Sequence, residues 1–363
     1  MSKLLPVHYE DKLAYEIVME HDFLSLNAKL SALGYQKNTK ICIISDSNVA
    51  KIYEKELEKL LENSFPTIIN FTFNAGEGSK NIETVEKLYE ELIINHFDRH
   101  DLLLALGGGV VGDLTGFAAS TYLRGIDFIQ IPTSLLSQVD SSIGGKTGVD
   151  FKQYKNMVGA FYQPKLVYMN LAVLRTLPKQ QLSSGLAEIV KHGCIKDKAY
   201  FTWLDEHMEA VFKLDPWVLE EMIYRSCQIK RDVVERDPKE KGERALLNFG
   251  HTIGHAIEKL ADFKLYHGEC VAIGMAAAVY LSVKKGLLAE CDLETVQSLL
   301  RKAGLPLSVK NQNAKDVLTA TKSDKKMEAG HIKFILLNKI GDAYIDTNVS
   351  DEELAEAIAF VLE

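Results

Sequence analysis

A helix expected at 181–196 carries three residues whose types could do chemistry. Glu188, Lys191 and His192 lie at positions i, i+3 and i+4, so they share one helical face. The rest of this segment is mostly apolar. A carboxylate in such a setting requires a cationic partner, because an unpaired buried charge is strongly unfavourable. These residues could therefore bind a metal ion or an anionic substrate.

Three histidines follow on two further expected helices. His251 and His255 are four residues apart, as the two zinc-binding histidines of an H-E-x-x-H helix are, and His267 precedes Gly268-Glu269 at the start of a strongly apolar helix. A single histidine could be a hydrogen-bonded core residue. Three histidines and a carboxylate from different helices favour a metal site with an open position. The residues alone leave open which three are the ligands.

The first half of the chain contains a glycine-rich turn. The apolar run 102–106 leads into glycines at 107, 109 and 112, which satisfy G-x-G-x-x-G between an expected strand and helix. Asp46-Ser47-Asn48 and Gly76-Glu77-Gly78-Ser79-Lys80 follow two other expected strands. Ligands of doubly wound sheets collect at such strand ends, so together the three turns predict a nucleotide site, although each alone could be a turn or a helix cap.

The segment 132–156 is rich in hydroxyl groups and contains Gly144-Gly145-Lys146-Thr147. It is not a P-loop, because Asp140 occupies the position of the first glycine. A lysine flanked by glycines still suits an anion. We expect a binding loop held against the core, and the alternative is a polar surface loop.

The expected elements divide the chain into two parts. The first part, 1–178, is an α/β domain with a mostly parallel nucleotide-binding sheet, and the second, 179–363, is a helical metal- and substrate-binding domain, with Pro178 at the junction and the active site expected in the cleft between them. The expected strands are 39–45, 67–73, 101–106, 126–131, 165–169 and a short piece at 331–337. The expected helices are 80–97, 110–121, 181–196, 200–212, 216–236, 249–262, 268–285, 293–303 and 350–362, with Asn248 as a helix cap.

Composition excludes several classes of protein. The chain has 363 residues, of which 47% are hydrophobic and 25% are charged, as in an ordinary globular protein of about two domains. The net charge of −8 argues against a nucleic-acid partner, and no apolar run predicts a membrane span or a signal peptide. The five scattered cysteines are typical of a reducing compartment, so we expect a cytoplasmic protein.

Several motifs together resemble the 3-dehydroquinate synthases, which are sugar phosphate cyclases. These are DSSIGGKTG, GLAEIVKHG and KGERALLNFGHTIGHAIE followed by HGE, and the match runs in order from Asp46 to Lys325-Lys326. The resemblance implies an NAD-binding α/β domain, a helical domain with one divalent metal (zinc or cobalt) and a homodimer. It also implies conversion of 3-deoxy-D-arabino-heptulosonate 7-phosphate (DAHP) to 3-dehydroquinate and phosphate in the shikimate pathway. The implied steps are transient oxidation by NAD, β-elimination, re-reduction and aldol closure.

The resemblance also assigns residues. The metal ligands become Glu188, His251 and His267, whereas helical spacing alone would pair His251 with His255. The implied catalytic and substrate-facing residues are Arg124, Asp140, Lys146, Asn156, Lys191, Lys230, Arg244, Asn248, His255 and Lys326. The implied cofactor residues are Asp46, Asn48, Gly76, Glu77, Ser79, Lys80, Gly108, Gly109, Val110, Val111, Gly112, Asp113, Thr133, Ser134, Lys146, Lys155, Val173, Leu174, Arg175 and Thr176. With Glu188 bound to metal, Lys191 is expected to turn toward substrate.

Some positions depart from the family pattern, and other functions compete with this one. Ser134 replaces a usual threonine, Tyr154 a usual glycine, and Gln180-Gln181 a common Arg-Glu pair. The alternatives are a cyclase of cyclitol biosynthesis, a metal-dependent dehydrogenase of the glycerol-dehydrogenase type and a non-catalytic NAD-sensing protein. The dehydrogenase would release NADH.

Overall fold

The computed structural model describes residues 3–152, 154–262, 264–322, 327–328 and 331–363, with only the backbone of 327–328 and 331–332. The chain divides into two compact units, Met1–Leu177 and Pro178–Glu363. Within the described residues, no helix combines the length and apolar character needed to cross a membrane.

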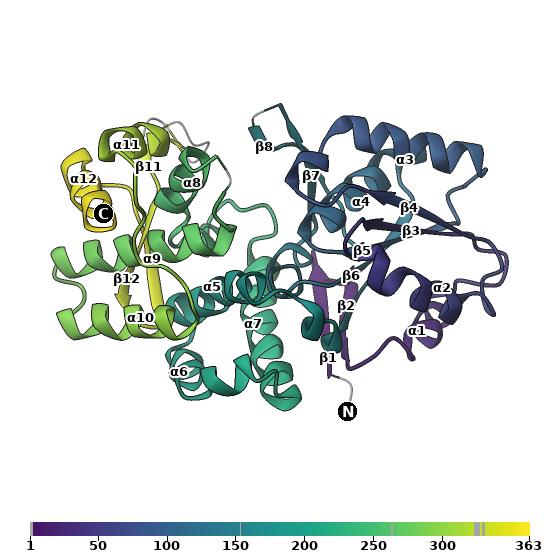
Figure 1. Ribbon diagram of the computed structural model, residues 1–363, viewed down its shortest axis with the longest axis horizontal. Coiled ribbons are helices and arrows are strands. Elements are labelled where there is room, and N and C mark those ends of the chain that lie inside the picture. Colours follow the sequence, from purple (N-terminus) through teal and green to yellow (C-terminus); the bar gives the residue numbers. More distant parts are fainter. Residues whose placement is uncertain (1–2, 153, 263, 323–326, 329–330) are drawn as a thin grey trace. The chain divides into compact units, whose positions relative to one another are not determined.

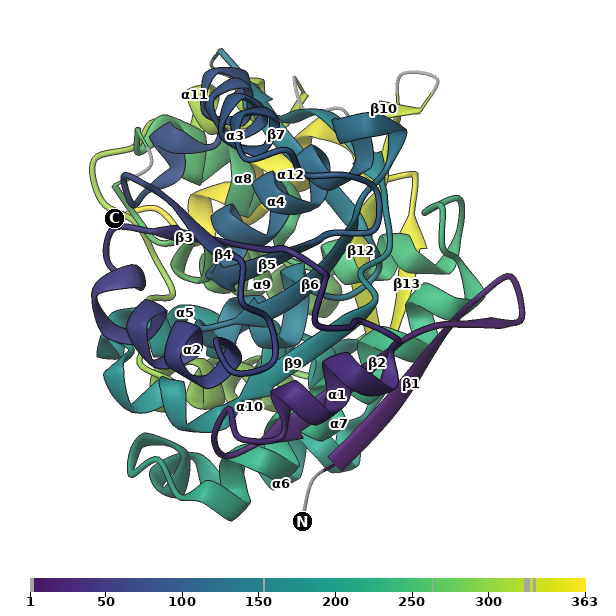
Figure 2. The same cartoon turned by 90° about the vertical axis from the view of Figure 1, so that its right-hand side faces the viewer.

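The first unit is built on a seven-stranded sheet in the order β1-β2-β9-β6-β5-β3-β4. In this order, all strands from β2 to β4 are parallel to their neighbours. Strand β1 pairs with β2 in an antiparallel hairpin, and β2 lies beside β9 (Figure 2). The bounds are β1 Lys3–Tyr9, β2 Lys12–Glu20, β3 Ile41–Asp46, β4 Ile68–Phe73, β5 Leu102–Gly107, β6 Asp127–Pro132 and β9 Leu166–Asn170. The expected parallel sheet is confirmed.

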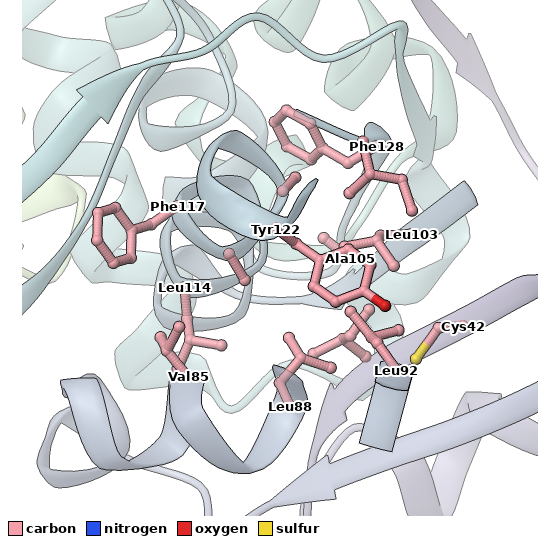
Figure 3. Close-up of a cluster of buried hydrophobic side chains, with 14 of the residues drawn as sticks. Cys42, Val85, Leu88, Leu92, Leu103, Ala105, Leu114, Phe117, Tyr122 and Phe128 are labelled. Carbon is pink, nitrogen blue, oxygen red and sulfur yellow. The ribbon is translucent and has the colours of Figure 1, made fainter. Parts of the chain in front are cut away.

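Helices cover both faces of this sheet (Figure 1). Successive side chains of a strand point to opposite faces. In β3, Cys42 and Ile44 therefore join one apolar cluster, with α3 and α4, while Ile41 and Ile43 join another, with α1 and α2. Figure 3 shows the first cluster. The helices are α1 Leu26–Ala32, α2 Lys55–Leu61, α3 Ile82–Ile94 and α4 Gly109–Thr121. The central strands are thus buried on both faces, as a parallel sheet requires.

The segment expected to be one long loop contains a hairpin instead. β7 (Lys146–Phe151) and β8 (Tyr154–Phe161) pair in an antiparallel ladder. Gly148 and Gly159 face each other across it, and a Cβ at Gly159 would lie 2.3 Å from the Thr147 carbonyl oxygen. Gly148 and Gly159 are thus required by close strand pairing, whereas Gly144 and Gly145 precede the hairpin.

The second unit is mainly helical. Its central helix α9 is mostly buried and packs against α5, α8, α10 and α12. The helices are α5 Lys179–Lys196, α6 Lys198–Phe212, α7 Pro216–Arg236, α8 His251–Leu260, α9 His267–Lys284, α10 Glu290–Lys302, α11 Ala314–Lys322 and α12 Asp351–Phe360. Two small antiparallel pairs complete the unit: β10 Met327–Glu328 with β11 His331–Ile332, and β12 Phe334–Lys339 with β13 Asp342–Asp346.

Candidate functional site

The first unit has a topological switch point between β3 and β5. From β3 the chain continues to β4 on one side, whereas β5 and then β6 lie on the other side. Loops leaving two such neighbouring strands diverge and leave a crevice at their carboxyl ends, where ligands of doubly wound sheets bind. Asp46 ends β3 and Gly108 follows β5, so two predicted cofactor residues flank this point.

The glycines of the turn after β5 differ in whether the surrounding atoms leave room for a side chain. A Cβ at Gly107 would lie 2.4 Å from Val111 Cγ2, and one at Gly112 would lie 2.4 Å from Gln130 Oε1. These two glycines are therefore needed where α4 packs on the sheet. A Cβ at Gly108 would meet only Ser134 Oγ, at 3.6 Å. Packing within the protein therefore does not require a glycine at 108. Close approach of a ligand to the backbone of the turn would require one.

Several predicted cofactor residues are positioned by local contacts. Asp46 Oδ1 accepts hydrogen bonds from the amides of Asn48 (2.8 Å) and Val49 (3.1 Å), so it caps the turn after β3. Thr176 Oγ1 is 2.6 Å from the hydroxyl of Tyr53. The side chains of Val111, Val173 and Leu174 are buried in the core, so any contact they make with a cofactor would be through the backbone.

Lys80 is the centre of a charged network. Its Nζ lies 2.7 Å from Asp113 Oδ2 and 3.8 Å from Glu77 Oε1, and it donates to Asn156 Oδ1 at 2.6 Å. Burial lowers the pKa of Lys80, but the carboxylates of Asp113 and Glu77 raise it, and the net pKa is above its ordinary value. Lys155 joins the network at 4.0 Å from Glu77. The structure thus brings together residues predicted for cofactor and for substrate.

Other predicted residues of the first unit lie elsewhere. Arg124 has a left-handed backbone (φ 68°) in the turn before β6, so it lies at the amino ends of the parallel strands, whereas the glycine turn lies at their carboxyl ends. Asp140 lies in a short π-helix, Ser137–Ser141, and Lys146 is the exposed first residue of β7. Thr133 is buried just after β6, and Ser134 contacts Ser137 Oγ at 2.9 Å.

Glu188 is the centre of the candidate metal site in the second unit. It is completely buried on α5, and Lys191 donates to its Oε2. Its other oxygen, Oε1, lies 3.5 Å from His251 Nε2 and 3.6 Å from His267 Nε2. Lys191 is therefore paired with Glu188 rather than turned away from it. The lysine and the histidines engage different oxygens of one carboxylate.

Both histidines present the same nitrogen to Glu188. His251 Nδ1 lies 3.1 Å from the Phe249 carbonyl oxygen, and His267 Nδ1 lies 3.6 Å from Glu258 Oε2. An acceptor at Nδ1 favours a proton there and leaves Nε2 as the ligand atom, which is the usual arrangement around bound metals. One carboxylate and two imidazoles form a known catalytic zinc set. The donor chemistry fits a divalent cation.

Glycines set the spacing of the helices that carry these side chains. A Cβ at Gly268 would lie 2.0 Å from the Ser184 carbonyl oxygen, so α9 begins directly against the backbone of α5. Gly250, whose φ is 79°, precedes α8, and a Cβ at Gly274 would lie 1.8 Å from its carbonyl oxygen. Gly250, rather than the expected Asn248, is thus the residue that caps α8, because its left-handed backbone suits glycine.

The electrostatics of His267 reflect its carboxylate neighbours. Burial lowers the pKa of His267, but Glu188 and Glu258 raise it more, to about 9. Without a metal, the ring is therefore protonated near neutral pH. A cation that binds Nε2 must displace this proton.

A second group of potential ligands shares His267. His255, Glu258 and His267 have ligand atoms within 4.8 Å of one another, as do Glu188, His251 and His267. In the described part of the chain, neither group contains both His251 and His255. Glu258 was not among the predicted residues, although it shares a helical face with His255 and His251 at spacings of three and seven.

Two of the remaining predicted residues of the second unit, Arg244 and Asn248, are held by contacts within the segment 237–248. Arg244 is buried and its Nη1 donates to the Pro238 carbonyl oxygen at 2.7 Å. Asn248 Nδ2 donates to Glu240 Oε1 at 2.9 Å. Lys230 is buried on α7, and His192, on α5, contacts Ser226 Oγ at 2.8 Å. Lys326 lies outside the described residues.

Comparison of the fold with solved structures shows the class of protein to which the chain is similar. The chain aligns with 2-epi-5-epi-valiolone synthase from Streptomyces hygroscopicus, solved with NAD⁺ and Zn²⁺, at a TM-score of 0.88 and 29% identity over 98% of this chain and 99% of that one. It also aligns with 2-deoxy-scyllo-inosose synthase, solved with carbaglucose-6-phosphate, NAD⁺ and Co²⁺. The TM-score is 0.87, and the sequences are 25% identical over 99% of this chain and 100% of that one. The fold is that of the sugar phosphate cyclases.

Sequence comparison identifies the family. Residues 70–184 match the 3-dehydroquinate synthase N-terminal model, and residues 185–327 match the C-terminal model. The 3-dehydroquinate synthase of Ruminiclostridium cellulolyticum is 43% identical over 345 residues, which cover 95% of each chain. The chain belongs to the 3-dehydroquinate synthase family.

Proposed function

We propose that this protein converts DAHP to 3-dehydroquinate and phosphate, using NAD and one divalent metal, zinc or cobalt. The observation that carries the proposal is the grouping of Glu188, His251 and His267 around one carboxylate oxygen in a chain of this family. The identity to a 3-dehydroquinate synthase, 43%, exceeds that to the valiolone synthase, 29%. This difference favours DAHP over the substrates of cyclitol cyclases.

We assign the metal to Glu188, His251 and His267. A cation bound there would act as a Lewis acid that makes a substrate hydroxyl easier to deprotonate. The alternative group, His255 with Glu258 and His267, leaves the fully buried Glu188 outside the ligand set. His255 lies next to this site, with its ring centre 5.1 Å from that of His251, and an imidazole there can accept and return a proton.

The cationic side chains would bind the anionic groups of DAHP. Lys146, Lys191, Lys230, Arg244 and Lys326 carry positive charge, and each charge-assisted hydrogen bond to phosphate or carboxylate contributes about 1.5–3 kcal/mol. Asn156 and Asn248 would donate neutral hydrogen bonds. The turn of Gly108 and Gly109 at the switch point would hold the dinucleotide.

The decisive experiment measures phosphate release from DAHP with NAD and zinc or cobalt, followed by identification of the product. Because the hydride returns to the substrate, NAD should be needed only in catalytic amount and absorbance at 340 nm should not rise with turnover. Stoichiometric NADH would instead show a dehydrogenase.

Location and assembly are further parts of the proposal. The five cysteines, all of them among the described residues, form no disulfide, which supports a reducing, cytoplasmic compartment. A homodimer remains a prediction from the resemblance, and sedimentation equilibrium of the purified protein would test it.

A further inference from the structure

Asp237 follows the last residue of α7 and accepts hydrogen bonds from backbone amides of the next segment. Its Oδ1 accepts from Lys241 at 2.8 Å, and its Oδ2 accepts from Gly242 at 2.7 Å and from Arg244 at 3.0 Å. Burial raises the pKa of Asp237, but these amides and the charge of Arg244 lower it more, so the net pKa is below its ordinary value. One ionised carboxylate thus closes a turn that leads directly to Arg244.

Capping of α7 does not explain why an aspartate lies at this position. The carboxyl end of a helix carries negative partial charge, which disfavours a carboxylate. Asp215, at the amino end of α7, has the favoured location, and it accepts the amides of Trp217 at 3.0 Å and Val218 at 3.1 Å. The amides of the segment after α7, rather than the helix itself, account for Asp237.

Arg244 is tied to this turn through both its backbone and its side chain. Its amide donates to Asp237, and its Nη1 donates to the Pro238 carbonyl oxygen at 2.7 Å. A long side chain such as arginine loses much rotamer entropy when it is fixed. Because both contacts are made to two adjacent residues, the position of the buried guanidinium depends on the shape of the turn.

We propose that Asp237 is a positioning residue for Arg244: it holds the turn 237–244 in the shape that places the guanidinium where it binds an anionic group of the substrate. This inference rests on the proposed function for the identity of the substrate. Asp237 itself contacts only the protein in this assignment, and it acts through Arg244.

Glu243 offers a competing explanation, because it precedes Arg244 and forms ion pairs with Arg236 and Lys196. The side chain of Arg236 is 57% exposed, and those of Glu243 and Lys196 are also partly exposed. Solvent weakens ion pairs of this kind. We therefore assign the turn to Asp237 rather than to Glu243.

The test compares Asp237→Ala with Asp215→Ala, which removes the same type of contact at the far end of α7, about 30 Å away. We expect D237A to raise the KM for DAHP by about tenfold or more, because a substrate contact is misplaced, and to change kcat by less than about threefold. D215A should lower the unfolding temperature and leave both constants within about twofold of wild type. Glu243→Gln should raise KM less than D237A does.

Arg244→Met provides the second part of the test. R244M should raise KM at least as much as D237A, and D237A/R244M should match R244M within about twofold, because the two residues act as one unit. A wild-type KM in D237A, or losses that multiply in the double variant, would overturn the proposal. If D237A does not fold, D237N, which keeps one acceptor oxygen, is measured in the same way and should lie between wild type and R244M.

A spectroscopic measurement separates the inference from the proposed activity. In protein labelled with ¹⁵N-arginine, the Nε resonance of Arg244, assigned by its absence in R244M, should shift in D237A and not in D215A. An unshifted resonance in D237A would contradict the positioning role. This signal does not depend on turnover, whereas phosphate release by the wild-type protein tests the proposed function.

Discussion

Lys191 and His251 engage opposite oxygens of the Glu188 carboxylate, the lysine at Oε2 and the histidine at Oε1. A single buried carboxylate thus faces the Lys191 amino group on one side and two imidazoles on the other. The site does not require Lys191 to leave before a metal binds, because the lysine does not occupy the oxygen that faces the histidines.

This arrangement predicts the effect of replacing Lys191. Lys191→Met should bind zinc at least as tightly as wild type, because one positive charge near the metal is removed. Phosphate release should fall by about tenfold or more, since a charge-assisted contact to substrate is lost. Metal competition titration and steady-state kinetics would measure the two effects. Loss of zinc from K191M would show instead that the lysine is needed to orient Glu188.

The ligand assignment predicts which variants lose metal. Glu188→Ala and His267→Ala should be purified nearly metal-free, whereas His255→Ala should retain metal and lose activity, because His255 is assigned to proton transfer. Elemental analysis of the purified variants, with unfolding temperature as a control for folding, would measure this. A metal-free H255A protein beside a fully loaded E188A protein would favour the group of His255, Glu258 and His267.

The pKa of His267 predicts how metal affinity depends on pH. With a pKa of about 9, the ring is protonated at neutral pH in the metal-free protein, and binding must release that proton. Apparent zinc affinity should therefore rise with pH between 7 and 9, by up to about tenfold per pH unit. Calorimetry in buffers of different ionisation enthalpy would count the released protons. Glu258→Gln, which removes one of the carboxylates that raise this pKa, should release fewer; equal counts would argue against this origin of the shift.

Gly268 predicts a metal defect without any change of ligand. In Gly268→Ala, the new methyl group would overlap the Ser184 carbonyl, so α9 must move away from α5 and His267 away from Glu188. Overpacking of this kind costs about 1–3 kcal/mol. We expect a lower unfolding temperature together with weaker zinc binding. Unchanged zinc affinity would mean that the helices adjust without separating the ligands.

The sequence predicted the parallel strands well because they are buried on both faces. Segments such as 39–45 and 101–106 are nearly continuous apolar runs, and they became β3 and β5. The β1–β2 hairpin was missed because Lys3–Tyr9, which forms the sheet edge, and Lys12–Glu20 beside it mix charged with apolar residues. The β7–β8 hairpin was missed because its glycines are typical of loops.

The chemistry of the site was predictable as a set of residue types, but its contacts were not. Helical spacing placed Glu188 beside Lys191, yet nothing in one helix shows which oxygen faces His251 and His267, since those histidines come from α8 and α9. The network of Lys80, Asp113 and Asn156 likewise joins segments far apart in the chain. Such contacts depend on tertiary packing rather than on local periodicity.

The close contacts of Gly268 and Gly274 have a consequence for engineering. Where backbone meets backbone, no side chain can swell or shrink to change the gap, so the dimensions of the metal cage are carried by the main chain. A shorter ligand, as in His251→Cys or His267→Asp, would then leave its donor atom farther from the metal, because the helices cannot move closer to compensate. A redesign for another metal would therefore have to combine ligand softness with a side chain of the same reach as histidine.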